Sequence, residues 1–283
     1  VLLKNDRHLL PLDIKGKIAL IGSMADARNN MCGMWSMTCT PSRHGTLLEG
    51  IRSAAGDKAE ILYAKGSNIY YAAETEKAAT GIRPLERGDN RQLLDEALRI
   101  AARADVIVAA LGECAEMSGE SVSRTNLEIP DAQQDLLKAL VKTGKPVVLL
   151  LFTGRPLVLN WEATNVHSIL NVWFGGSETG DAVADVLFGK VAPSGKLTTT
   201  FPRSVGQLPL FYNHLNTGRP DPDNRIFNRY ASNYLDESNE PLYPFGYGLS
   251  YTDFVYGELQ ISSETLPKNG ELTVSVTVTN KGN

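Results

Sequence analysis

The chain has 283 residues, of which 42% are hydrophobic and 21% charged, a balance that is ordinary for a folded globular protein. Its formal net charge of −4 argues against nucleic acid or an anionic membrane surface as a partner. No apolar run approaches the length of a membrane span, so we expect no transmembrane segment. The length suits one large domain, or one domain and part of another.

The opening residues, VLLKNDRHLLPL, have no positively charged region followed by an apolar core, so they contain no visible signal peptide. The first five residues resemble the tail of a preceding segment, and the first strand is expected at 17–22. Since the chain looks like part of something longer, the absence of a signal does not indicate its compartment.

Cysteine and histidine are too sparse to predict a metal site. The three cysteines, Cys32, Cys39 and Cys114, have no CxxC spacing, and the four histidines show neither HExxH nor HxH spacing. An odd set of cysteines is not a disulfide framework. A disulfide between Cys32 and Cys39 remains open if the protein is exported, because sequence does not show the geometry that it requires.

Short apolar runs alternate with helical patterns through the first two thirds of the chain. Strands are predicted at 17–22, 59–66, 106–111, 146–152 and 168–173. Helices are predicted at 46–55, 90–103, 132–144 and 178–188, and residues 67–90 form a polar excursion. Continuous apolar strands are typical of a parallel sheet covered on both faces. The order predicts a doubly wound, mostly parallel α/β sandwich, which we assign to residues 1–250.

The remaining part of the chain changes character. Residues 193–250 are rich in Pro, Asn, Asp and Tyr, and predict one strand within 193–202 followed by a segment that wraps the surface or reaches another domain. Residues 257–262 and 272–279 alternate apolar and polar side chains, as half-buried antiparallel strands do. A two-stranded piece is marginal alone. We therefore predict that 251–283 begin a truncated β-sandwich domain.

The candidate site is the long loop after the central strand, residues 113–130. Loops that leave the carboxyl ends of parallel strands hold the ligands of open α/β sheets, and this one is longer than usual. It carries Glu113, Glu116 and Glu120, with Arg124 close behind. A loop carboxyl group near other carboxylates suits a general acid. The alternative is that all three glutamates are simply solvated.

Other motifs are absent or ambiguous. The sequence has no GxSxG, GxxxxGK[ST] or GxGxxG motif, which disfavours a serine hydrolase, a phosphate loop and a dinucleotide site. Trp35, in a polar loop at 29–45, is either a cap on the core or a platform for a planar or sugar ligand. Arg155, after the strand at 146–152, is interpreted as a loop salt-bridge partner rather than a ligand contact.

Six stretches, in order along the chain, together resemble glycoside hydrolase family 3, and most of all its periplasmic β-glucosidases: VLLKNDRHLLPL, CGMWS, GECAEMSGESVSRTNLEIP, GKPVVLLLFTGRP, PSGKLTTTFPRSVGQLP and LYPFGYGLSYTDF. The resemblance implies that a barrel at the N-terminus supplies an aspartate nucleophile, and that an α/β sandwich supplies the acid/base glutamate on a loop. A fibronectin-III-like domain often follows. This chain resembles the second domain and the start of the third.

The resemblance assigns roles to four residues. Glu120, before the SVSR run, corresponds to the family acid/base, and Glu116 is the fallback. Glu113 matches a recurrent Gly-Glu pair that shapes the loop. Trp35 corresponds to an aromatic residue that stacks on the sugar in an outer subsite of some members.

The implied function is a domain of a retaining, exo-acting β-glycosidase without a cofactor. Its expected partners are a β-glucoside or oligosaccharide substrate, with a β-xyloside as the alternative, and the barrel domain of the same chain. The implied location is the periplasm. The alternative function is a non-catalytic carbohydrate-binding or scaffold module.

Overall fold

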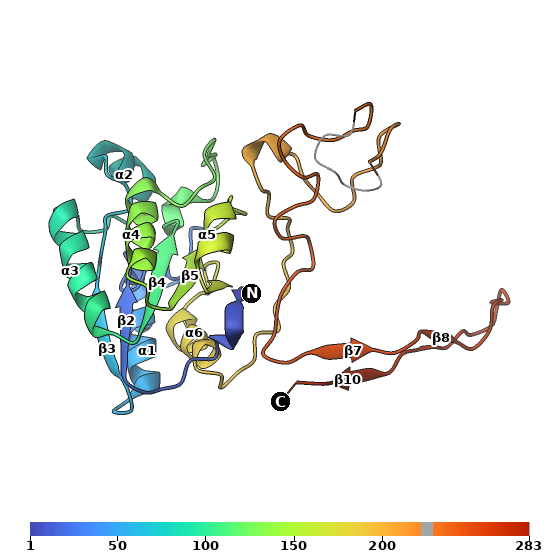
Figure 1. Cartoon of the computed structure of the whole chain (residues 1–283), viewed down its shortest axis with the longest axis horizontal. Helices are drawn as coiled ribbons and strands as arrows, with labels where there is room; N and C mark the ends of the chain where they lie inside the picture. The colour runs from blue at the N-terminus through green and yellow to red at the C-terminus, as the bar shows by residue number, and fades with distance from the viewer. Residues whose placement is uncertain (222–228, 283) are drawn as a thin grey trace.

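The computed structural model describes residues 1–221 and 229–282. Its centre is a six-stranded sheet with the order β1-β6-β5-β4-β2-β3 (Figure 1). Five strands run parallel to one another, and the first strand lies antiparallel at the edge. The strands are β1 (Leu2–Asn5), β2 (Lys17–Ile21), β3 (Glu60–Ala64), β4 (Val106–Gly112), β5 (Val147–Phe152) and β6 (Ser168–Asn171).

Helices cover both faces of this sheet (Figure 1). They are α1 (Leu47–Ala55), α2 (Ala73–Thr80), α3 (Asn90–Arg103), α4 (Asp131–Lys142), α5 (Asn160–Asn165) and α6 (Thr179–Leu187). Side chains of α1 and α6 pack in one core, and those of α3 and α4 in another. The predicted doubly wound, mostly parallel α/β sandwich is confirmed.

Strand β4 explains why the central apolar run is continuous. Val108 and Ala110 face the core with α1 and α6, whereas Ile107, Ala109 and Leu111 face the core with α3 and α4. Successive side chains point to opposite faces of a strand. Both faces are buried, so every position must be apolar, and the burial of each residue is stabilising.

Three predictions about elements were wrong. The first residues form β1, because Leu2 and Leu3 are buried and β1 pairs with β6. The polar excursion contains α2, whose Glu76 is buried and paired with Arg87, so an apolar stripe does not identify this helix. The strand expected within 193–202 is absent from the strands of the described residues. Only an isolated bridge joins Phe201 to Tyr243.

The segment from 193 to 250 leaves the sandwich and returns to it (Figure 1). The return is fixed by the pairing of Leu249 with Leu2 and by the Tyr251 hydroxyl, which donates to the carbonyl of Val186 at 2.7 Å. Residues 222–228, within the stretch predicted to wrap the surface, lie outside the described residues.

The C-terminal residues form two small antiparallel sheets that run away from the sandwich (Figure 1). One pairs β7 (Phe254–Tyr256) with β10 (Val278–Asn280), and the other pairs β8 (Gln260–Ile261) with β9 (Val274–Ser275). The predicted antiparallel strands are therefore present. Their assignment to a separate β-sandwich domain from residue 251 remains a prediction.

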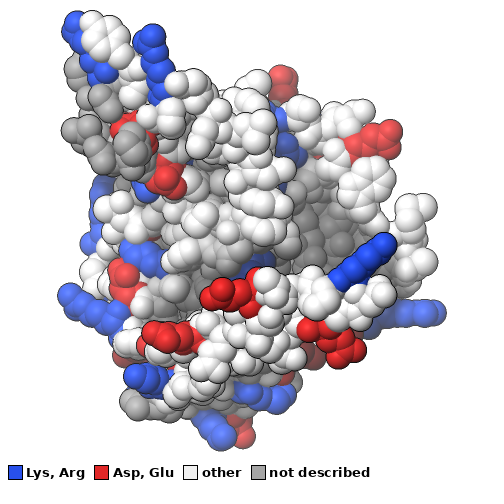
Figure 2. Space-filling model, turned by 90° about the vertical axis from the view of Figure 1, so that its right-hand side faces the viewer, with Lys and Arg blue, Asp and Glu red and all other residues white. Residues whose placement is uncertain are grey.

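Figure 2 shows the face of the molecule toward which these C-terminal strands point. Uncharged side chains occupy the middle of this face, and acidic and basic residues are scattered around them. Charges of both signs are interspersed, so this face has no continuous basic surface. Within the described residues, no helix is long and apolar enough to cross a membrane.

Candidate active site

The sheet order brings two loops to the carboxyl ends of adjacent strands. From β2 the chain proceeds to β3 on one side, and then returns to β4 on the other side of β2. The loops after β2 and β4 therefore diverge at a topological switch point, where open α/β sheets bind ligands. The loop after β2 contains Trp35, and the loop after β4 contains Glu120.

The loop after β4 starts from a fixed point. Gly112 has φ +129°, and a Cβ added there would lie 1.9 Å from the carbonyl oxygen of Phe152. The Gly112 N–H donates to Gln133 Oε1 at 2.9 Å, and Gln133 Nε2 donates to the Gly112 carbonyl at 2.7 Å. Both backbone groups of Gly112 are therefore hydrogen-bonded to a side chain of α4. This fixes the backbone at the point where the buried residue Glu113 follows.

That residue, Glu113, is fully buried and shapes the loop. Its Oε1 accepts from Arg124 Nη1 at 2.8 Å and lies 3.0 Å from Arg155 Nε. Its Oε2 accepts from the Thr153 hydroxyl at 2.9 Å and from the Gly154 N–H at 3.0 Å. Two guanidinium groups therefore balance the charge of this carboxylate, and both of its oxygens accept hydrogen bonds from the protein. The carboxylate does not face a ligand.

Arg155 also ties the loop down from the next strand. Its Nη2 donates to the carbonyls of Met117 and Val122, the latter at 2.9 Å. The interpretation of Arg155 as a salt-bridge partner is confirmed. Its guanidinium joins the base of the loop to both sides of the Glu120 turn.

The first part of the loop is anchored in the core. Cys114, Ala115 and Met117 are all buried, and the last two belong to a short 3-10 helix, Ala115–Met117. Burial raises the pKa of the Cys114 thiol to about 12, so the thiolate needed for reactivity does not form near neutral pH. From 118 to 126 the loop, which includes the turn around Glu120, is exposed or partly exposed.

Glu116 is not presented to a ligand. Its side chain is 11% exposed, and its Oε1 lies 3.5 Å from Arg83 Nε. Arg83 also donates through Nη1 to the carbonyl of Gly33 at 2.9 Å, so it links the loops after β2 and β4. Arg83 was not predicted as a site residue, because it lies in a polar stretch without a motif.

Glu120, by contrast, is exposed on the turn beside Trp35. A Cβ added to Gly119 would lie 2.8 Å from Met34 Cγ and 3.5 Å from Trp35 Nε1. The following residue, Ser121, has φ +60°, a conformation that costs a non-glycine residue energy and is concentrated at functional sites. The structure therefore brings the predicted site residues Trp35 and Glu120 into one region.

Trp35 does not cap the core, since its side chain is 69% exposed. It lies in a ring closed by a disulfide between Cys32 and Cys39, with 6.4 Å between their Cα atoms. The disulfide that sequence left open is thus formed. An exposed indole held in a closed ring is available as a flat apolar surface for a ligand.

Residues 1–251 match the family described as "Glycosyl hydrolase family 3 C-terminal domain". The chain belongs to this family. The resemblance of the six sequence stretches is therefore confirmed, and the sandwich is a family 3 C-terminal domain.

Relatives match the chain along its whole length. It is 49% identical to a periplasmic β-glucosidase of Salmonella typhimurium and 37% identical to a β-xylosidase of Formosa agariphila, covering 100% of this chain in both cases. It spans only 37% and 36% of those proteins.

A crystal structure of a β-glucosidase from Listeria innocua in complex with isofagomine matches 99% of this chain. Its TM-score is 0.79 and its identity is 39%, and the matched part is 36% of that protein. Isofagomine is a ligand of that protein.

Proposed function

We propose that this family 3 domain supplies the general acid/base of a retaining, exo-acting β-glycosidase, with Glu120 as the acid/base and Trp35 as a sugar-binding platform. The observation that carries the proposal is the difference among the three loop glutamates. Glu113 is bonded on both oxygens and Glu116 is paired with Arg83. Within the described part of the chain, Glu120 is the exposed carboxylate of the three, and the residue before it, Gly119, lies against Trp35.

A carboxyl group in this position performs two proton transfers. Protonated Glu120 would donate to the glycosidic oxygen as the bond to the leaving group breaks. As a carboxylate, it would then accept a proton from the water that releases the sugar. In a retaining enzyme the acid/base lies about 5–5.5 Å from the nucleophile. The resemblance assigns that nucleophile to an aspartate on the barrel domain.

The proposed substrate is a β-glucoside or an oligosaccharide with a terminal β-glucose, and a β-xyloside is the second choice. The names of the Salmonella and Formosa relatives support these two classes. The proposed location is the periplasm, supported by the name of the Salmonella relative and by the Cys32–Cys39 disulfide, which suits an oxidising compartment.

A non-catalytic carbohydrate-binding role is the second candidate. It is favoured by an exposed aromatic pair, Tyr212 and Phe245, whose rings stack with centroids 4.3 Å apart. Stacked exposed rings suit a sugar face. They provide no acid or base, so this role predicts binding without turnover.

The test is Glu120→Ala in the full-length enzyme with two substrates. A dinitrophenyl glycoside hardly needs a proton to lose its leaving group, so the glycosyl-enzyme should form and its hydrolysis should stall. A disaccharide needs that proton, so the first step should also slow. The loss in kcat/KM on the disaccharide should reach about 10²–10⁴-fold. Azide should rescue the stalled intermediate, because a small anion attacks without a base.

Glu116→Ala is the matched control, because it removes a carboxylate from the same loop without touching the exposed turn. It should lack the dependence on the leaving group and the azide rescue. If Glu116→Ala shows both and Glu120→Ala shows neither, Glu116 is the acid/base. If neither variant affects turnover, this loop does not supply the acid/base.

A further inference from the structure

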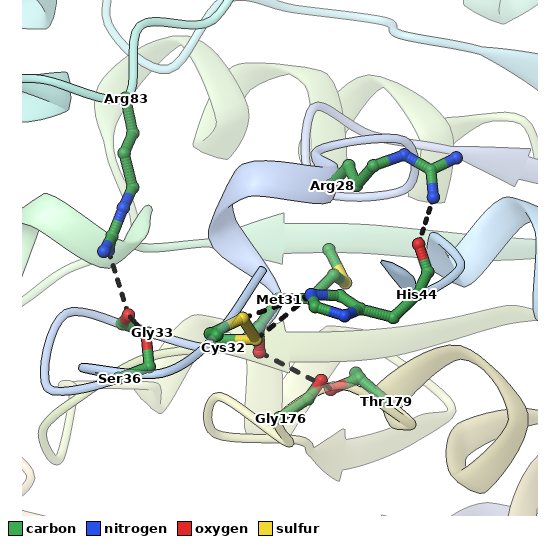
Figure 3. The surroundings of a disulfide bond; sticks show 10 residues. Arg28, Met31, Cys32, Gly33, Ser36, His44, Arg83, Gly176 and Thr179 are labelled. Atoms are coloured by element: carbon green, nitrogen blue, oxygen red, sulfur yellow. Dashed lines mark hydrogen bonds between the residues drawn. A yellow bond between two sulfur atoms is a disulfide. The ribbon is translucent and has the colours of Figure 1, made fainter. Parts of the chain in front are cut away.

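We propose that the Cys32–Cys39 disulfide is a redox-cleavable clamp that positions Trp35 beside the Glu120 turn. Its reduction releases Trp35 and weakens the binding of substrates that extend beyond the terminal sugar. The consequence for binding rests on the proposed function of Trp35. The clamp itself rests on the contacts of the ring (Figure 3).

The first end of the ring is fixed to the sandwich through Met31, which precedes Cys32. The Met31 carbonyl accepts from the Gly176 N–H at 3.2 Å and from the Thr179 hydroxyl at 3.5 Å. Thr179 begins α6, so this end of the ring is attached to a packed helix (Figure 3).

The second end is fixed through His44, whose ring faces both sulfur atoms (Figure 3). His44 Nε2 lies 3.1 Å from Cys39 Sγ and 3.5 Å from Cys32 Sγ. The His44 carbonyl accepts from Arg28, which also pairs with Glu49 of α1. Glu49 and Thr46 form the capping box of α1. The disulfide therefore joins two points that are each tied to a helix.

The tip of the ring has little packing of its own. Trp35 is 69% exposed and Met37 is 92% exposed. The Gly33 carbonyl accepts from the Ser36 hydroxyl at 2.7 Å and from Arg83, but these bonds hold only the near side of the ring. Closing a loop covalently removes conformational freedom from the residues inside it. The Gly33–Ser36 bond holds the backbone turn around Trp35, but none of the hydrogen bonds in the described part of the chain reaches the indole itself, so the disulfide is what closes the ring.

The disulfide joins two residues that are not buried in the core. Cys32 and Cys39 are both partly exposed, unlike the free Cys114. A small dithiol reductant would attack Cys32 Sγ as a thiolate, break the sulfur–sulfur bond and release Cys39 as a thiolate, which takes up a proton. The second thiol of the reductant then attacks the mixed disulfide and frees Cys32, and the reductant leaves as a cyclic disulfide. His44 Nε2 lies 3.1 Å from the Sγ of Cys39, the sulfur that is released.

The clamp is tested directly on Trp35 fluorescence in this 283-residue chain. The protein for this test carries Trp161→Phe and Trp173→Phe, so that Trp35 is its sole indole. EDTA is present to keep metal ions from the freed thiols, because the ligand atoms of Cys32, Cys39 and His44 lie within 4.8 Å of one another. Reduction with dithiothreitol should lower the fluorescence anisotropy of Trp35, and reoxidation should restore it. Alkylation and mass spectrometry confirm that Cys32 and Cys39 were cleaved.

A variant with Cys32→Ser and Cys39→Ser is the matched control. It should have the low anisotropy of the reduced chain and should not respond to dithiothreitol. Reversible reduction of the parent chain keeps the test valid if this variant folds poorly. Unchanged anisotropy after confirmed cleavage would overturn the clamp.

The effect on binding is measured in the full-length enzyme. Reduction should raise KM for a disaccharide about three- to tenfold and change kcat little, because aromatic stacking is lost while the acid/base remains. Trp35→Ala should raise KM equally and remove the sensitivity to reduction. If Trp35→Ala leaves KM unchanged, the proposed role of Trp35 fails, whereas the anisotropy result still decides the clamp. If Trp35→Ala raises KM but reduction of the parent enzyme does not, the clamp is overturned.

Discussion

Glu113 is the residue on which the loop geometry depends. Its carboxylate, which is buried, faces Arg124 and Arg155, so Glu113→Gln would leave two guanidinium groups short of an anion. We expect the free energy of unfolding to fall by about 3–5 kcal/mol, the usual cost of removing one partner of a buried ion pair. Urea denaturation of the 283-residue chain measures this loss.

Glu120→Gln is the control for that experiment, because it makes the same chemical change on the exposed turn. It should alter the free energy of unfolding by less than about 0.5 kcal/mol. Equal losses in the two variants would contradict the structural role of Glu113.

The sequence alone did not show which of the three loop glutamates are paired with arginines and which is exposed. What distinguishes them is contact with Arg155, which follows β5, and with Arg83, which precedes α3. These partners are distant in sequence, and no periodicity indicates them. The family resemblance correctly gave Glu113 a role in shaping the loop, and Arg155 was correctly interpreted as a salt-bridge partner.

At the scale of elements, the junction between β4 and its loop tolerates no side chain. Gly112→Ala would place a methyl group 1.9 Å from the Phe152 carbonyl oxygen on the neighbouring strand, at φ +129°. Since neither strand can move without breaking the sheet, we expect a loss of more than about 3 kcal/mol, or no soluble folded protein. Thermal unfolding followed by circular dichroism measures it.

Gly144→Ala provides the comparison. Gly144 also has a positive φ, +75°, but no heavy atom lies within 4 Å of an added Cβ. Only the backbone strain of about 1–2 kcal/mol should appear. If both variants are equally stable, the close approach at Gly112 is not a constraint.

Elements were predictable where burial dictates composition. The strands β2, β4 and β5 are buried on both faces, so their apolar runs identify them. Helix α2 was missed because its buried Glu76 is paired with Arg87 rather than packed among apolar residues. Strand β1 was missed because the pairing that defines it, with β6, joins opposite ends of the sandwich sequence.

At the scale of the whole molecule, the sequence predicted the type of sheet and the loop after β4, but not which other loop would meet it. That depends on the strand order, in which β2 lies between β3 and β4. Local patterns do not encode this order. The position of Trp35 beside Gly119 was therefore visible only in three dimensions, although the family resemblance had already singled out Trp35.

The 283-residue chain expressed alone should hydrolyse no glycoside. Double displacement in a retaining enzyme needs two carboxyl groups at the same sugar, one as the nucleophile and the other as the acid/base. This chain spans 37% of the Salmonella β-glucosidase, and the family resemblance places the nucleophile on a barrel domain. Of the loop carboxylates, Glu113 and Glu116 are held by arginines and cannot replace it. An aryl β-glucoside assay should therefore give no turnover, whereas the full-length enzyme should be active. Turnover by the isolated chain that disappears in Glu120→Gln would show that a second carboxylate of this domain serves as the nucleophile.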